Sequence, residues 1–155
     1  EGKNLLLTPG IYDLEEPIAV NRPDTIVLGM GLATLRAAKG NVCLETGNVQ
    51  GLILAGLLFD AGEIKSDNLL VIGNEGQKSE DNGKNIYLSD LFFHVGGTDT
   101  DTPVSVKCCA TINSNHVVGD NFWVWRADHG DNVAWEKTRQ KMESSSTGMM
   151  SRCMR

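Results

Sequence analysis

The feature of this chain that most limits its fold is a short apolar pattern that occurs four times. Each copy contains an apolar triplet, a small or turn-forming pair and a second apolar stretch. The copies begin at Ile26, Leu52, Ile86 and His116. The extra length between copies falls in two polar segments, Asn74–Asn85 and Gly96–Thr102. The copies thus begin 26, 34 and 30 residues apart. Repeats of such lengths with insertions confined to loops are typical of solenoids.

The repeated elements are predicted to be strands. They are short, rich in β-branched residues and bounded by Gly, Asn and Asp, and few stretches sustain a helical period. Residues Gly29, Gly56, Asp90 and Gly119 are predicted to mark equivalent sharp bends. A strand, bend, strand and loop describe one coil of a parallel β-helix, in which successive coils stack about 4.8 Å apart.

The inward face of these coils is predicted to carry a continuous apolar ladder. Its proposed members are Leu28, Leu54, Leu88 and Val118. The main alternative is a doubly wound nucleotide-binding fold, because Gly29–Thr34 resembles the start of a glycine-rich phosphate loop. Against it, the third glycine of that loop is missing and the helix that should follow would end at Gly40.

Composition excludes several functional classes. The 155 residues suit about one domain. A net charge of −6 argues against a nucleic-acid partner, and no apolar run approaches the roughly 20 residues of a membrane helix. The four cysteines, at positions 43, 108, 109 and 153, are expected to be free thiols in the core. A zinc site that combines Cys108, Cys109 and His116 lacks a recognised ligand spacing.

The last twenty residues differ from the rest. Residues 136–155 have five basic and two acidic side chains and contain four of the five methionines. When residues 136–155 are back-translated to DNA and read one base out of frame, the codons are compatible with a further coil. That coil would contain an apolar triplet, an Asn-Gly-Asp-Asp turn and a β-branched strand. We therefore expect residues 1–135 to be N-terminal coils and residues 136–155 to be a poorly structured, frameshift-derived tail. The alternative is a genuine basic tail rich in Ser and Met.

Three strings resemble a known group. They are TPGIYDLEEPIAVNRPDTIVLGMGLATL, GLLFDAG and FWVWRADHGDNVAW. Together they resemble secreted β-helix proteins of the pectate-lyase-like superfamily, related to glycoside hydrolase family 55. The resemblance implies an all-β, right-handed parallel β-helix, here truncated, that acts on or binds a polysaccharide outside the cell.

Two carboxylates are the usual catalytic groups of glycosidases, about 5–5.5 Å apart for retention and about 6.5–9.5 Å apart for inversion. Asp60 ends a predicted strand, and Asp128 follows the corresponding strand of a later coil. Stacked coils would bring them to one side of the solenoid, so they are the candidate catalytic pair. For each aspartate taken singly, the competing interpretation is a turn-capping residue bonded to backbone amides.

A candidate substrate-binding cluster contains Trp125, Arg126, His129 and, from the preceding coil, His94. Strand alternation places Trp123 and Trp125 on one face, where they could stack against sugar rings, and Arg126 on the other. The competing interpretation makes one tryptophan a core residue, pairs Arg126 with a carboxylate and leaves His94 an ordinary surface residue.

No cofactor or metal is predicted. Asp99 and Asp101 are oxygen ligands of the kind calcium prefers, but alternating aspartates in a loop are usually only solvated. The expected partner is a polysaccharide, and the open end of the β-helix is expected to promote self-association. The function alternative to a glycosidase-like protein is a non-catalytic polysaccharide-binding or adhesion module.

Overall fold

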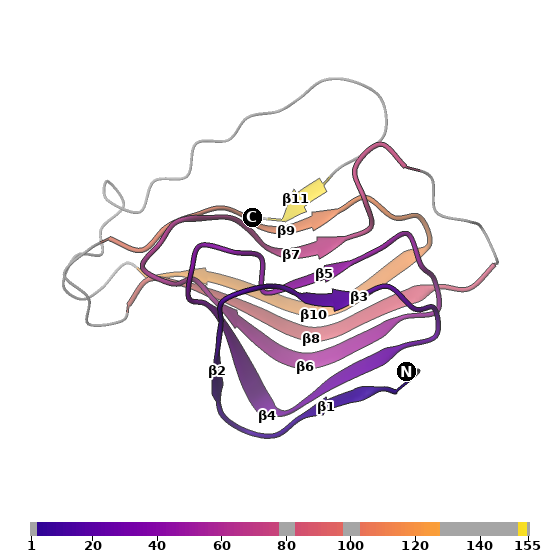
Figure 1. Ribbon diagram of the computed structural model, residues 1–155, viewed down its shortest axis with the longest axis horizontal. Coiled ribbons are helices and arrows are strands. Elements are labelled where there is room, and N and C mark those ends of the chain that lie inside the picture. Colours follow the sequence, from indigo (N-terminus) through magenta and orange to yellow (C-terminus); the bar gives the residue numbers. More distant parts are fainter. Residues whose placement is uncertain (1–2, 78–82, 98–102, 128–151, 155) are drawn as a thin grey trace.

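The computed structural model describes residues 3–77, 83–97, 103–127 and 152–154. Within them every regular element is a strand (Figure 1). Sheet A has six strands: β1 (Leu5–Leu7), β2 (Ile11–Leu14), β4 (Ile26–Ala37), β6 (Ile53–Asp60), β8 (Ile86–Val95) and β10 (Val117–Arg126). Sheet B has five: β3 (Ile18–Val20), β5 (Leu44–Thr46), β7 (Ser66–Ile72), β9 (Val106–Ile112) and β11 (Arg152–Met154).

The chain alternates between the two sheets, which lie one above the other in Figure 1. From β4 to β10 the strands of sheets A and B alternate, and each strand from β5 to β10 pairs in parallel with its counterpart one coil earlier. Long β4 pairs with both β1 and β2 on its other side. This topology is a parallel β-helix, as the repeat predicted, and the described residues contain no helix that a doubly wound fold would need.

A column of left-handed residues bends the strands of sheet A. The register places Gly56 opposite Asp90, and Asp90 opposite Asn121, with φ angles of 69°, 53° and 54°. The predicted bends at Gly56 and Asp90 are therefore confirmed, but Gly29 and Gly119 do not have positive φ. Gly29 is needed for a different reason, because a Cβ there would overlap the carbonyl oxygen of Gly56.

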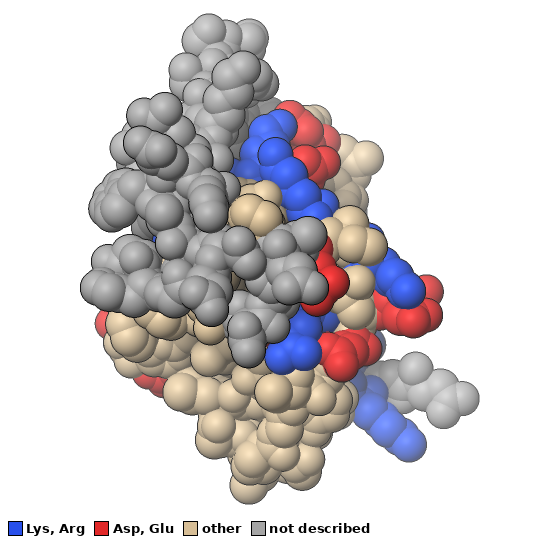
Figure 2. Space-filling model, turned by 90° about the vertical axis from the view of Figure 1, so that its left-hand side faces the viewer, with Lys and Arg blue, Asp and Glu red and all other residues tan. Residues whose placement is uncertain are grey.

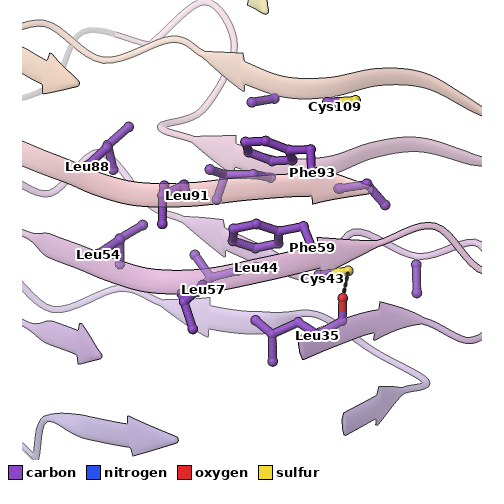
Figure 3. Close-up of a cluster of buried hydrophobic side chains, with 14 of the residues drawn as sticks. Leu35, Cys43, Leu44, Leu54, Leu57, Phe59, Leu88, Leu91, Phe93 and Cys109 are labelled. Carbon is purple, nitrogen blue, oxygen red and sulfur yellow. Dashed lines mark hydrogen bonds between the residues drawn. The ribbon is translucent and has the colours of Figure 1, made fainter. Parts of the chain in front are cut away.

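The inward ladder of sheet A begins with Val27, Leu54 and Leu88, which are all at most 1% exposed. The prediction of Leu28 and Val118 for this ladder is wrong, since they are 41% and 46% exposed. A shift of one residue moves a side chain to the opposite face of a strand. Deeper in the core, Phe59 stacks on Phe93 with ring centroids 5.0 Å apart (Figure 3).

The cysteines only partly follow expectation. Cys43 and Cys109 are buried free thiols, and Cys43 donates to the carbonyl oxygen of Leu35 (Figure 3). Cys108 is disulfide-bonded instead. The prediction of a free thiol at Cys108 is therefore wrong.

Most of the predicted tail lies outside the described residues, which exclude residues 128–151. The short strand β11 pairs with β9 in antiparallel orientation, unlike the other strand pairs described here. A strand of a further β-helix coil would instead pair with β9 in parallel orientation. Across the described ranges, no helix is long and apolar enough to cross a membrane.

Candidate functional site

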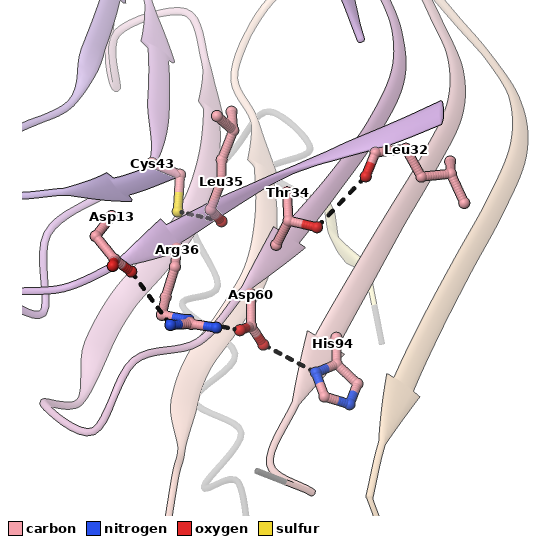
Figure 4. Close-up of polar contacts among 8 residues, drawn as sticks. All are labelled: Asp13, Leu32, Thr34, Leu35, Arg36, Cys43, Asp60 and His94. Carbon is pink, nitrogen blue, oxygen red and sulfur yellow. Dashed lines mark hydrogen bonds and ion pairs between the residues drawn. The ribbon is translucent and has the colours of Figure 1, made fainter. Parts of the chain in front are cut away.

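One outward-facing column of sheet A gathers charged and aromatic side chains from five strands. The register aligns Asp13 with Arg36, Arg36 with Asp60, Asp60 with His94, and His94 with Trp125. We call this set the polar ladder, and Figure 4 shows its members from Asp13 to His94. Because each member occupies the same position in its coil, residues far apart in the sequence become neighbours on the sheet.

Strand alternation explains why Asp60 belongs to this column. Phe59 points into the core, so the next residue of β6 points outward. The Asp60 side chain is nevertheless only 6% exposed, because its neighbours in the ladder lie on both sides. Arg36 Nε donates to Oδ2 at 3.0 Å, and His94 Nδ1 lies 2.8 Å from Oδ1 (Figure 4).

The charges of the ladder alternate. Arg36 also donates from a terminal nitrogen to Asp13 Oδ1 at 3.3 Å, so one guanidinium joins two carboxylates. The hydrogen bond to Asp60 raises the pKa of Arg36, although burial acts in the opposite direction. Charge-assisted bonds of this kind are stronger than neutral ones. Both oxygens of Asp60 are therefore engaged by side chains, rather than by the backbone amides of a turn.

The aromatic end of the ladder continues this surface. The rings of His94 and Trp125 lie 4.8 Å apart with an interplanar angle of 32°. Trp125 stacks in turn beside Trp123 at 6.5 Å, and Phe92 contacts Trp123 edge-on. Trp123 and Trp125 are 60% and 41% exposed, so a large part of both indole rings is accessible to solvent. This confirms the prediction that both tryptophans share one face.

A niche lies at the end of β8, next to the imidazole. Gly97 has φ of +80°, and a Cβ built on it would lie 3.5 Å from His94 Nε2 and 3.8 Å from Trp125 Cη2. The same Cβ would lie 3.0 Å from the Cβ of Ala127. A side chain at position 97 would therefore press on Ala127 and lie beside Nε2. We call the surroundings of Nε2 formed by His94, Gly97, Trp125 and Ala127 the glycine niche.

The candidate residues from the sequence separate into three groups. Asp60, His94 and Trp125 lie together in the polar ladder. Arg126 pairs in register with buried Val95 and influences the buried thiol of Cys109, so it lies on the face opposite the tryptophans. Asp128 and His129 lie outside the described residues.

Sequence reasoning missed Arg36, Asp13 and Gly97. A signal for Arg36 was present, because Arg36, Asp60 and His94 each lie directly after an inward-facing Leu or Phe near the end of a strand. Aligning the second halves of the coils, rather than their starts, would have placed these three in one column.

The face of the molecule in Figure 2 carries charges of both signs. On the face in Figure 2, acidic and basic side chains lie next to one another beside the grey residues and do not form a field of one sign. Within the described ranges, no group of three or more His, Cys, Asp or Glu side chains is arranged to hold a metal ion. Asp99 and Asp101, the residues considered for calcium, lie outside these ranges.

The fold and the site together define a parallel β-helix that displays exposed tryptophans beside a hydrogen-bonded polar ladder. The chain belongs to the LAM55 pectate lyase-like domain family, whose model matches residues 1–151. This membership confirms the resemblance to pectate-lyase-like proteins related to glycoside hydrolase family 55.

Known relatives agree in sequence and in fold. An exo-beta-1,3-glucanase of Streptomyces sp. (strain SirexAA-E / ActE) is 40% identical over 139 residues, which are 90% of this chain and 22% of that protein. The structure of sacteLam55A from Streptomyces sp. SirexAA-E has a TM-score of 0.81 at 39% identity. A variant of sacteLam55A in complex with glucose gives the same values. In both structures the match covers 88% of this chain and 24% of the other.

Proposed function

We propose that this chain supplies a glucan-binding face to a secreted β-1,3-glucan hydrolase, and that the chain alone binds glucan without cleaving it. The observation that carries the proposal is the pair of exposed indole rings beside His94, in a chain 40% identical to an exo-beta-1,3-glucanase. Pyranose rings present C–H groups that pack on the electron-rich faces of aromatic rings.

The contacts of Asp60 support the proposed lack of cleavage. A carboxylate that attacks a sugar, or activates water for it, needs a free oxygen toward the substrate. Both Asp60 oxygens are bonded within the protein, and the side chain is almost fully buried. Asp60 therefore suits a structural and orienting role, which disfavours the predicted Asp60–Asp128 catalytic pair. The chain also spans only 22% of the glucanase it matches, so we assign catalysis to parts of the full-length protein beyond this segment.

Two measurements test the proposal. Calorimetric titration with β-1,3-linked glucohexaose measures binding, and a reducing-sugar assay with a β-1,3-glucan measures cleavage. The proposal predicts saturable binding and no release of sugar above the rate of a buffer blank. No heat of binding at millimolar oligosaccharide contradicts the binding role. Release of glucose by the purified chain contradicts the assignment of catalysis elsewhere.

We expect the chain to self-associate through β10, the edge strand of sheet A among the described residues. Strand β10 is the last of the described order, and its Phe122 and Val124 are only partly buried. Their register partners on β8, Leu91 and Phe93, are at most 1% exposed. An edge strand with incompletely covered apolar residues favours pairing with another chain.

A further inference from the structure

We infer that Asp60 is a positioning residue that holds His94 with Nδ1 as the donor, so that Nε2 accepts a sugar hydroxyl in the glycine niche. The inference rests on the proposed glucan-binding function, and it adds the orienting residue and the atom that meets the ligand.

The first step concerns the proton on His94. Asp60 forms an ion pair with Arg36 through Oδ2, and an ionised carboxylate is an acceptor at both oxygens. The short contact between Asp60 Oδ1 and His94 Nδ1 therefore requires that Nδ1 carries the proton. In the neutral ring, Nε2 then has a lone pair and acts as an acceptor. Figure 4 shows this second nitrogen turned away from Asp60.

The second step concerns the space around Nε2. Residue 97 is glycine, and a methyl group there would lie 3.5 Å from Nε2 and 3.8 Å from Trp125 Cη2, where it would hinder the approach of a ligand. The Trp125 ring forms one wall, 4.8 Å from the imidazole between centroids and 41% exposed. Because the imidazole lies against one face of the indole, a sugar whose hydroxyl reaches Nε2 would meet the neighbouring edges of both rings. A hydroxyl that donates to Nε2 would thus be fixed in direction by both contacts.

The third step predicts what Asp60→Asn does. The guanidinium of Arg36 donates only, so the amide oxygen of Asn should turn toward Arg36 and the amide NH₂ toward His94. Nδ1 would then have to accept, and the proton would move to Nε2. The Asn side chain has nearly the same shape as Asp, but it would therefore turn Nε2 from a hydrogen-bond acceptor into a donor. The same change of tautomer is expected wherever a carboxylate that orients a histidine is replaced by an amide.

The experiment reads the tautomer directly. Long-range ¹H–¹⁵N spectra of the histidine-labelled chain, with His94 assigned by loss of its signals in His94→Gln, should show Nδ1 protonated and Nε2 bare in the neutral ring. Asp60→Asn should show the opposite pattern and should bind β-1,3-linked glucohexaose about tenfold more weakly or worse. Unchanged tautomer and affinity in Asp60→Asn would overturn the inference.

A pair of glycine variants tests the niche separately. Gly97→Ala adds a methyl group beside Nε2, whereas Gly76→Ala adds one where nothing lies within 4 Å, and both positions have similar positive φ. Glucohexaose binding should be lost in Gly97→Ala and kept in Gly76→Ala, with circular dichroism showing both folded. Equal binding by the two variants would overturn the niche as the subsite.

These results also separate this inference from the proposed function. A wild-type chain that binds glucan with Nε2 protonated overturns the inference alone. A chain with the predicted tautomer that binds no glucan overturns the proposed function, and with it the subsite. If Asp60→Asn fails to fold, the wild-type spectrum and the glycine pair still decide.

Discussion

Asp60 and His94 are joined by a 2.8 Å contact between Oδ1 and Nδ1, although 34 positions separate them in the chain. They meet because β6 and β8 are stacked in parallel with Asp60 directly opposite His94. Arg36 closes the other side of the carboxylate from β4. A solenoid thus turns one residue in each coil into a continuous line of interacting groups, and that line leads to the exposed indole rings.

Removing Arg36 tests the stability of this line. Arg36→Gln should lower the free energy of unfolding by about 1–3 kcal/mol, because the buried Asp60 carboxylate loses its charged partner. Urea denaturation followed by circular dichroism measures this. Lys39→Gln is the matched control: Lys39 pairs with Glu15 at 3.8 Å in an exposed position, so its loss should change little. Equal effects of the two substitutions would show that Asp60 does not depend on Arg36.

The apolar register predicts a contrast between two leucines of neighbouring coils. Leu54→Ala should cost roughly 2–5 kcal/mol, because it leaves a cavity in a fully buried column. Leu28→Ala should cost less than about 1 kcal/mol, since Leu28 is 41% exposed on the other face. Chemical denaturation of both variants provides the comparison. Similar losses for the two would mean that the register is wrong.

The sequence was sufficient to predict the β-helix, since the recurring apolar pattern with polar insertions has few other structural solutions. It was not sufficient for the register. Leu28 and Val118 were each placed one position away from the true inward column, which contains Val27 and Leu88. The error comes from where the copies of the pattern begin: Ile26 pairs with Ile53 rather than with Leu52, and Ile86 pairs with Val117 rather than with His116.

The candidate site was predictable only where the pattern was local. Trp123 and Trp125 are two residues apart on one strand, so alternation alone placed them on the same face. The ion pair of Arg36 with Asp60 depends on which coil stacks on which, and on the register between them. Local periodicity does not contain that information, so the sequence pattern did not indicate that Arg36 is the partner of Asp60.

Two buried thiols should resist alkylation in the native chain. Burial raises the pKa of Cys43 to about 12 and that of Cys109 to about 11, from 9.0. At about pH 8.5 both should be almost unlabelled by iodoacetamide when native and labelled in guanidinium, because the thiolate is the reactive form. Peptide mass spectrometry locates the label.

The same pKa shifts predict a loss of stability at high pH. Unfolded thiols ionise near their ordinary pKa, whereas native thiols stay protonated up to about 11–12. The stability that these two thiols contribute is therefore fully present below about pH 9, and it is lost as the pH rises through their native pKa values. Rapid labelling of native Cys43 at about pH 8.5 would contradict its burial.

The coding DNA tests the origin of residues 136–155. If they result from a frameshift, a one-base shift after the Trp135 codon should open a frame that encodes an apolar triplet, a turn and a β-branched strand. Sequencing through and beyond this point decides the matter. A stop codon or a non-repetitive sequence in the shifted frame would instead indicate a genuine basic tail.

The most direct test of the central claim is isothermal titration of β-1,3-linked glucohexaose into the wild-type chain, Trp125→Ala and Tyr87→Ala. Tyr87 is the matched control, because it is 47% exposed on the outward face of the same sheet but lies outside the polar ladder. The account predicts that Trp125→Ala weakens binding at least about tenfold and that Tyr87→Ala binds like wild type. Equal affinity of all three proteins would contradict a glucan-binding face at Trp125.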